Sequence, residues 1–222
     1  VDGPSLVRMA VAPSIADDAA VAAAIVEDLE DPARGVVDGA TISVEARFGA
    51  ALRQRLTRTG WTAGETWTPL VHDLDARVVD RSLRVVVAGP DEVGDRVSVQ
   101  RAAFDTSTFT SDRWREMATS PAYAQARCLI GYDDESRPVA AVTVWSAGVG
   151  RPGLLEPMGV HRDHRGRGYG RAISRAAAAE LSALGASSAI VATPATNVGG
   201  IATYVAAGFQ RLPDVPDLTL AR

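Results

Sequence analysis

The sequence predicts an α/β chain built from two related halves, and three observations lead to this prediction. Apolar runs of strand length alternate with longer, helix-like segments along the chain. One of these runs, 154–160, leads through an arginine- and glycine-rich turn directly into an alanine-rich helix. The order strand, helix, strand, helix, glycine before an aromatic residue, strand occurs in both halves. We therefore expect helices that flank a sheet, with the second half as the more complete unit.

The first half, residues 1–78, carries the shorter set of elements. Asp17 and Asp18 stand in the first turn of its first helix, where carboxylates are favourable. The stretch between Ala12 and Asp28 contains no glycine, so no glycine-rich turn is expected here. The expected strands are 6–12, 41–46 and 68–74, and the expected helices are 17–29 and 48–59.

The second half, residues 79–222, carries a longer series of elements. Two of its strands are joined by the turn-rich segment DDESRP, which favours an antiparallel pair. Gly185 is expected to end the alanine-rich helix. The expected strands are 83–88, 127–132, 139–146, 154–160 and 187–193, and the expected helices are 91–104, 111–119, 170–184 and 201–208.

The glycine-rich turn is predicted to bind phosphate. Gly166, Gly168 and Gly170 allow the backbone to approach a ligand closely, and the helix that follows presents unpaired N–H groups and the positive end of its dipole. A dinucleotide-binding G-x-G-x-x-G would need glycine at Arg171, and a Walker loop needs a lysine, which this chain lacks. The spacing that fits is R-x-x-G-x-G, formed by Arg165, Gly168 and Gly170. Taken alone, this hexapeptide is equally compatible with an ordinary glycine-capped turn.

This spacing resembles the acyl-CoA pyrophosphate loop of the GCN5-related N-acetyltransferase (GNAT) family. Asn197, Tyr204 and the pair Gly208 and Phe209 follow in the order that the family has. The resemblance covers about residues 85–220. It implies a mixed, mostly antiparallel central sheet flanked by helices, with a splayed central strand. The whole chain is similar to tandem members such as the mycothiol synthase group, with a partial, degenerate unit at 1–78 and a GNAT domain at 79–222.

The resemblance also implies a binding site for acetyl-CoA. Backbone groups of the turn would hold the pyrophosphate, with arginine side chains as charged support. In the splayed strand, Gly159 fits a bulge, with an ordinary strand glycine as the alternative, and the N–H of Val160 is the candidate donor to the thioester carbonyl. The expected cofactor-binding residues are Met158, Gly159, Val160, Arg165, Gly166, Arg167, Gly168, Tyr169, Gly170, Arg171 and Asn197.

Two residues are the catalytic candidates that the resemblance implies. Tyr204 would be the general acid that protonates the departing sulfur, and the alternative is a tyrosine that only packs on the sheet. Glu156 would take the amine proton through water. An ordinary strand glutamate, with proton loss directly to bulk water, is the alternative for Glu156.

Composition excludes several other classes of function. The formal net charge of −4 provides no basic field for nucleic acid. No run of 18 apolar residues occurs, so no membrane span is expected, and the single cysteine, Cys128, fits a buried residue in a reducing cytoplasm. His161 and His164 have a spacing found in metal sites, but no third ligand of the right type is nearby, so no metal is expected.

The resulting functional hypothesis is transfer of an acetyl group from acetyl-CoA to a primary amine of a small molecule. Segment 104–120 is where the family reads its acceptor, and its carboxylates beside aromatic residues suit a cationic amine. Core aromatic residues beside solvated acids explain this segment equally well. A non-catalytic acyl-CoA-binding protein is the main alternative, a dinucleotide-binding enzyme is the third, and the sequence leaves a homodimer open.

Overall fold

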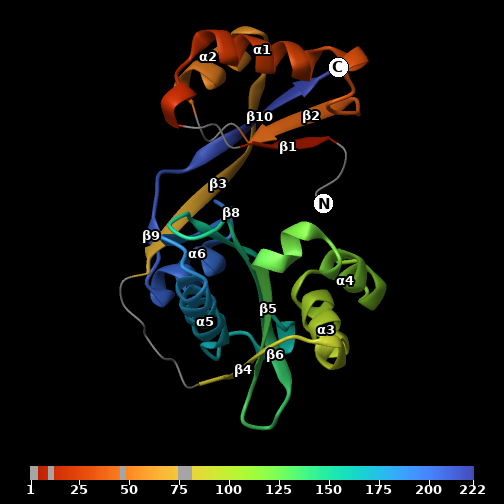
Figure 1. Cartoon of the computed structure of the whole chain (residues 1–222), viewed down its shortest axis with the longest axis vertical. Helices are drawn as coiled ribbons and strands as arrows, with labels where there is room; N and C mark the ends of the chain where they lie inside the picture. Colours follow the sequence, from red (N-terminus) through yellow and green to blue (C-terminus); the bar gives the residue numbers. More distant parts are fainter. Residues whose placement is uncertain (1–4, 10–12, 46–48, 75–81) are drawn as a thin grey trace. The chain divides into compact units, whose positions relative to one another are not determined.

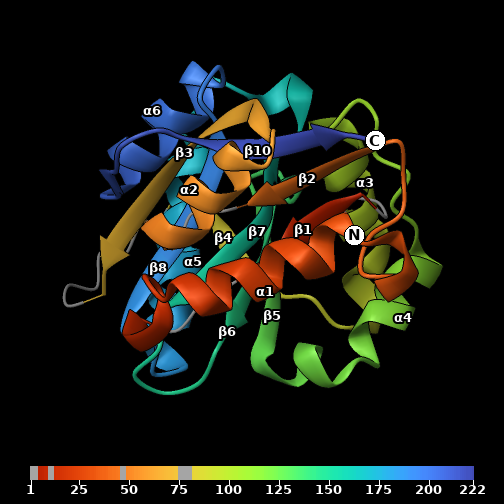
Figure 2. The same cartoon turned by 90° about the horizontal axis from the view of Figure 1, so that it is seen from above.

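The computed structural model describes residues 5–9, 13–45, 49–74 and 82–222, and Figures 1 and 2 show it from two sides. Its contacts divide the chain into two compact units. The first comprises residues 1–68, 194–196 and 213–222, and the second comprises 69–193 and 197–212. This division places the last ten residues with the N-terminal part of the chain, whereas the sequence pattern assigned all of 79–222 to one domain.

The sheet of the second unit is mixed and mostly antiparallel, as expected. Its strand order is β3-β8-β7-β6-β5-β4, and β9 pairs with β3. The pairs β4–β5, β5–β6 and β6–β7 are antiparallel, and β7–β8 is parallel. The strands are β3 (Thr62–Asp73), β4 (Arg84–Val87), β5 (Ala126–Tyr132), β6 (Pro138–Ser146), β7 (Gly153–Val160), β8 (Ser188–Pro194) and β9 (Gln210–Arg211).

Helices cover both faces of this sheet, and β7 shows which helix covers which face. Neighbouring residues of a strand point to opposite faces. Gly159 faces Ala103 and Phe104 at the end of α3, whereas the side chain of Val160 lies near Gly170 of α5. The helices of this unit are α3 (Val93–Ala103), α4 (Ser111–Ala118), α5 (Tyr169–Ala183) and α6 (Val198–Ala207), with 3-10 turns η3 (Pro90–Glu92), η4 (Pro121–Gln125) and η5 (Arg162–His164).

The main core of the second unit lies between α5 and the sheet. Val142 and Leu155 of the sheet pack with Ile173 and Leu181 of α5, and all four are buried. Alanine at 172 and 177 keeps α5 close to the strands. Gly185, with a φ of 81°, follows the helix in the left-handed conformation, which confirms the expected end of α5.

The first unit has the strand order β1-β2-β10-β3. Its β1–β2 pair is parallel, and β10 is antiparallel to both β2 and β3. Helices α1 and α2 supply Leu29 and Leu56 to a core that also contains Trp61 and Leu218. The elements are β1 (Leu6–Arg8), η1 (Pro13–Ile15), α1 (Ala19–Glu30), η2 (Pro32–Arg34), β2 (Thr41–Glu45), α2 (Ala50–Arg58) and β10 (Val215–Ala221), with the beginning of β3.

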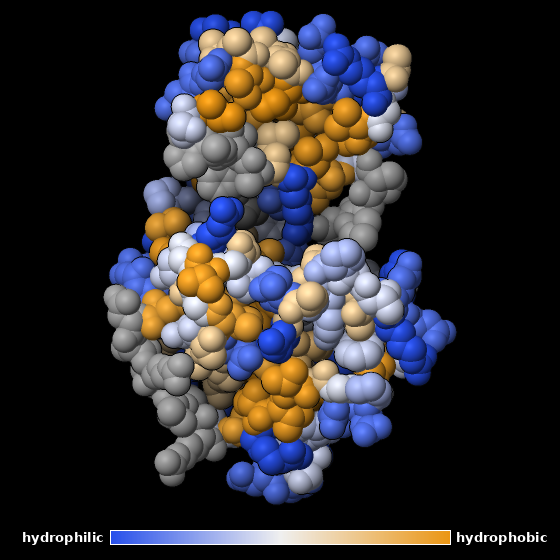
Figure 3. Space-filling model, in the orientation of Figure 1, coloured by the Kyte–Doolittle hydropathy of each residue, from blue (hydrophilic) through white to orange (hydrophobic). Residues whose placement is uncertain are grey.

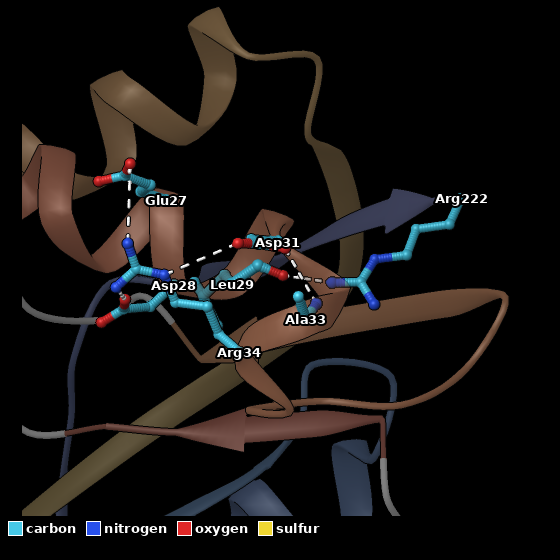
Figure 4. Close-up of polar contacts among 7 residues, drawn as sticks. All are labelled: Glu27, Asp28, Leu29, Asp31, Ala33, Arg34 and Arg222. Carbon is cyan, nitrogen blue, oxygen red and sulfur yellow. Dashed lines mark hydrogen bonds and ion pairs between the residues drawn. The ribbon is translucent and has the colours of Figure 1, made fainter.

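The C-terminal residue is tied to the end of α1 (Figure 4). The guanidinium of Arg222 donates to the carbonyl oxygens of Leu29 and Val37, the latter at 3.3 Å. Nearby, Arg34 pairs with Asp28 at 2.6 Å on the exposed side of the helix. Because the last carbonyls of a helix have no partner within the helix, Arg222 stabilises the end of α1.

The two halves of the chain repeat one order of elements. β1, α1, β2, α2 and β3 have the same order as β7, α5, β8, α6 and the C-terminal strands, and β1–β2 and β7–β8 are both parallel. In the sheets, β2 pairs with β10 and β8 with β3. The last strand of the first half, β3, therefore lies next to the parallel pair β7–β8, and the last strand of the second half, β10, lies next to the parallel pair β1–β2.

Candidate functional site

The strand β7 is paired over different lengths on its two sides. With β6 the ladder extends to Val160 opposite Ala140. With β8 it includes only Gly153 and Leu154, opposite Ala189 and Ile190. Beyond Leu154, one edge of β7 thus lies outside the ladder that the described residues form. This is the splayed strand that the sequence predicts.

The pairing with β6 fixes which main-chain groups point to this open edge. The N–H of His161 donates to the carbonyl of Val139 at 2.9 Å, and Gly159 is paired with Ala141. In an antiparallel ladder, alternate residues direct their N–H and C=O groups to opposite sides. Val160 and Met158 therefore direct theirs away from β6, toward the side where pairing with β8 has ended.

The bulge of β7 lies at a different position from the one expected. The register shifts between Val142 and Val144 of β6, opposite the segment from Leu155 to Met158, which contains the cis peptide bond Glu156–Pro157. The expectation of a bulge at Gly159 is wrong. A Cβ on Gly159 would lie 2.5 Å from the Cβ of Ala103, so this glycine is required for the close approach of α3.

The glycine-rich turn ends in an uncapped helix. Gly166 and Gly168 have φ values of 76° and 83°, which favour glycine. Gly168 is the N-cap of α5, and within the described part of the chain this helix has no side-chain cap. The amides of Tyr169 and Gly170 therefore remain for a ligand, at the positive end of the helix dipole. The geometry is that of an anion-binding site.

The arginines of the turn differ in what they contact. Arg165 donates to the carbonyl of Ala103 at 2.8 Å, and Arg162 donates to that of Ala102 at 2.8 Å. Both guanidinium groups therefore bind the C-terminal carbonyls of α3. Arg167 is exposed and has no hydrogen bond or ion pair within the described residues. The guanidinium of Arg171 lies 4.0 Å from where a Cβ of Gly168 would be.

Gly170 and Tyr169 have packing roles in the structure. A Cβ on Gly170 would lie 2.7 Å from Thr203 of α6 and 3.4 Å from Val160, so this glycine lets α5, α6 and β7 come together. Tyr169 is half-buried against the main core. Of the three glycines in the turn, Gly166 and Gly168 are thus required by backbone conformation and Gly170 by packing.

Asn197 is the N-cap of α6. Its Oδ1 accepts from the N–H of Gly200 at 3.0 Å, and its Nδ2 donates to Thr193 of β8 at 2.8 Å. The side chain is exposed and joins the end of β8 to the beginning of α6. Its predicted contact with a pantetheine arm would therefore be made by a residue whose position is already fixed.

Tyr204 and Glu156 are close enough to interact electrostatically. Tyr204 is buried, and its ring packs edge-on against Phe209 at a centroid distance of 5.7 Å. Burial raises the pKa of the Tyr204 hydroxyl above its usual value, and the negative charge of Glu156 raises it further. The phenol therefore keeps its proton throughout the neutral range, as a general acid must.

Three aromatic side chains form a row of contacts that ends at Glu156. The sequence did not indicate them as part of the site. The indole of Trp145 donates to the carbonyl of Glu156 at 2.7 Å. Tyr123 packs edge-on against Trp145 at 6.1 Å and against Trp114 at 6.0 Å. Trp145 lies in a strand, where an aromatic residue usually indicates core packing, so the sequence gives no signal of this contact.

The described residues contain no group of three potential metal ligands. His161 and His164 lie side by side, with ring centroids 5.2 Å apart. Among the described helices, none has the length and apolar character needed to cross a membrane.

Comparison with known proteins identifies the family. The profile of the acetyltransferase (GNAT) family matches residues 97–209, about half of the chain. A search of curated proteins found no match. A GCN5-related N-acetyltransferase from Sphaerobacter thermophilus is 16% identical, with a TM-score of 0.65 over 97% of this chain and 72% of that one.

Two further structures have the same fold. A tandem GNAT protein from the clavulanic acid biosynthesis pathway is 18% identical, with a TM-score of 0.69 over 99% of this chain and 76% of that one. A GCN5-related N-acetyltransferase from Kribbella flavida is 17% identical, with a TM-score of 0.59 over 81% of this chain and 67% of that one. The matching profile, the mostly antiparallel sheet and the uncapped glycine turn agree: the chain belongs to the acetyltransferase (GNAT) family.

Proposed function

We propose that this protein is an N-acetyltransferase that moves the acetyl group of acetyl-CoA to a primary amine of a small molecule. The observation that supports this most is the open edge of β7, next to a helix whose first turn has no cap. The open edge provides main-chain groups for an extended pantetheine arm, and the first turn of the helix provides amides for a pyrophosphate. An acyl-CoA carries both chemical features.

The proposed binding residues act mostly through their backbone. Gly168, Tyr169 and Gly170 would direct amides at the pyrophosphate, with the exposed Arg167 as the charged contact. Met158 and Val160 would pair with the pantetheine arm along the open edge of β7, in the manner of an added strand. The N–H of Val160 would donate to the thioester carbonyl. Arg165 would act indirectly, by fixing the turn to α3.

Bound acetyl-CoA would supply the activated acetyl group, and the protein would supply the proton transfers. The buried, protonated Tyr204 would give a proton to the departing sulfur. Glu156, at the bulge of β7, would accept the proton of the amine through water, or the amine would lose it directly to solvent. Tandem arrangement is part of this proposal, with the first unit as a degenerate GNAT-like unit, because the two halves repeat one order of elements.

Calorimetric titration with acetyl-CoA, with NAD as control, tests the binding step. We expect saturable binding of acetyl-CoA and none of NAD. An amine-dependent release of free CoA would then establish transfer. Binding without turnover across a broad panel of amines would instead favour a non-catalytic acyl-CoA-binding protein, and failure to bind acetyl-CoA would contradict both.

A further inference from the structure

Arg96 is a buried cation without a carboxylate partner. It lies in the middle of α3 and is 2% exposed. Its Nε donates to the Sγ of Cys128 at 3.0 Å, and its Nη2 to the hydroxyl of Thr143 at 3.5 Å. The ring of Phe109 lies 5.3 Å from the guanidinium carbon. Within the described residues, no acidic side chain pairs with it.

Such an arrangement is unfavourable for the protein alone. A guanidinium keeps its charge and has five N–H donors, whereas the sulfur of cysteine and the hydroxyl of threonine are weaker acceptors than a carboxylate. Buried charges in proteins are normally paired, because removal from water is costly without a partner of opposite charge. Arg96 therefore carries a buried charge that no carboxylate of the described residues compensates and that an anion could balance.

The hydroxyl that accepts from Arg96 belongs to β6, the neighbour of the strand that carries the proposed base. Thr143, which accepts from Arg96, stands between Val142 and Val144, where the register of β6 shifts opposite the Glu156–Pro157 bulge. Its side chain points to the α3 face of the sheet, because the neighbouring Val142 and Val144 belong to the core on the α5 face. The guanidinium is thus one strand away from Glu156.

Aromatic side chains connect this region with Glu156. Trp114, Tyr123 and Trp145 form a row of edge-on contacts, and Trp145 binds the Glu156 carbonyl. Tyr123 packs against the buried cluster that contains Cys128, the residue that accepts from Arg96, so the cation and the row belong to one region.

We infer, on the basis of the proposed function, that the acceptor is an amino carboxylic acid: Arg96 binds its carboxylate while its amine lies at Glu156. The fork of the guanidinium matches a carboxylate, which would compensate the charge on Arg96. The aromatic row would contact the carbon chain between the two ends. The anionic group, rather than the amine, would then distinguish this acceptor from other primary amines.

The test compares short unbranched amino acids with their primary amides, which keep the amine and lose the charge. Binding is measured by ligand-observed NMR with non-reactive desulfo-CoA present, and kcat/KM is measured with acetyl-CoA. We expect the acids to be preferred over the amides by about tenfold or more in both measurements. Equal values for the two series in the wild-type protein would overturn the inference, and this comparison requires no variant.

Arg96→Met tests the assigned residue, and Arg101→Met, at an exposed position of the same helix, is the matched control. We expect Arg96→Met to lose the preference for acids and to keep its KM for acetyl-CoA, and Arg101→Met to behave as wild type. A folded Arg96→Met protein that still prefers acids would overturn the assignment. If Arg96→Met does not fold, Arg96→Gln replaces it, with the same expectation.

The binding measurement separates this inference from the proposed function. Binding of acids that depends on Arg96, with no transfer to any amine, would contradict the acetyltransferase function and keep the carboxylate site. Efficient transfer to amides and acids alike would keep the function and contradict the site. Stronger binding of inorganic phosphate than of the acids would also contradict it.

Discussion

The identity of one residue, the N-cap, distinguishes two helices that have equivalent places in the two halves. Gly168 precedes α5 and offers no side chain to its amides. Asp18 precedes α1, and its carboxylate accepts from the N–H groups of Ala20 and Val21 at 2.8 and 3.1 Å. The anion site at α5 is therefore open, whereas at α1 the protein itself supplies the anion.

Gly168→Val should abolish the binding of acetyl-CoA. A β-branched residue at a φ of 83° is strained by about 1–3 kcal/mol, and relief of this strain would move the amides at the beginning of α5. Gly60→Val is the control, because Gly60 has a φ of 95° with open space around it and lies in the first unit. Calorimetry should show normal binding for the control, and normal binding by Gly168→Val would refute the assigned turn.

Tyr204→Phe should keep acetyl-CoA binding and lower kcat by about 10²-fold or more. Only the hydroxyl is lost, so packing against Phe209 is retained. Because burial raises the pKa of Tyr204, its acid form is present below that raised pKa and is lost only above it. The wild-type kcat should therefore show no decline from loss of this proton up to about pH 10. Identical rates for both proteins at every pH would make Tyr204 a packing residue only.

At the scale of elements, hydrophobic periodicity predicts the core strands and helices well, because it reports local burial. The strand 154–160, the helix behind it and the turn between them all form as expected. The beginning of β3, Thr62–Trp67, is mostly exposed and polar, so its sequence shows no apolar run, and the predicted strand begins six residues late. Its place depends on pairing with β10, which is distant in sequence.

The site is predictable where its chemistry is carried by backbone conformation. Glycines at 166 and 168 indicate the turn, since few other residues adopt these φ values. The partners of Arg165 and Gly159 lie on α3, far away in the sequence, so no local pattern could show that one binds α3 and the other makes room for it. The same holds for Trp145, whose bond to Glu156 depends on the register of two strands.

The difference between the two helix N-termini predicts one acetyl-CoA per chain. Asp18→Ala removes the cap of α1 and should lower the stability of the first unit by about 1 kcal/mol, without an effect on affinity. Calorimetry should give a stoichiometry of one for wild type and for this variant. A second equivalent bound by the wild-type protein would show that the first unit also holds the nucleotide.

At the scale of the whole molecule, the formal net charge is small, at −4. Figure 3 shows hydrophilic residues interspersed with hydrophobic ones on the face that it presents. The organisation that matters is the connectivity of the chain. β10 lies between β2 and β3 in the first unit, although it follows the second unit in sequence.

The last strand should therefore decide whether the first unit folds. A chain that ends at Leu212 lacks Leu218, a core residue, and Asp217, which accepts from the indole of Trp67 at 3.0 Å. Hydrogen exchange should show loss of protection in β2 and α1, because both edges that β10 covers become unpaired. A chain that ends at Leu220 is the control. It loses the last pair of the β10–β2 ladder, Ala221 with Thr41, and the terminal bonds of Arg222, and it should keep this protection apart from fraying at the end of α1 and the beginning of β2. Normal protection of β2 in the chain that ends at Leu212 would show that the first unit folds without the strand it receives from the other half.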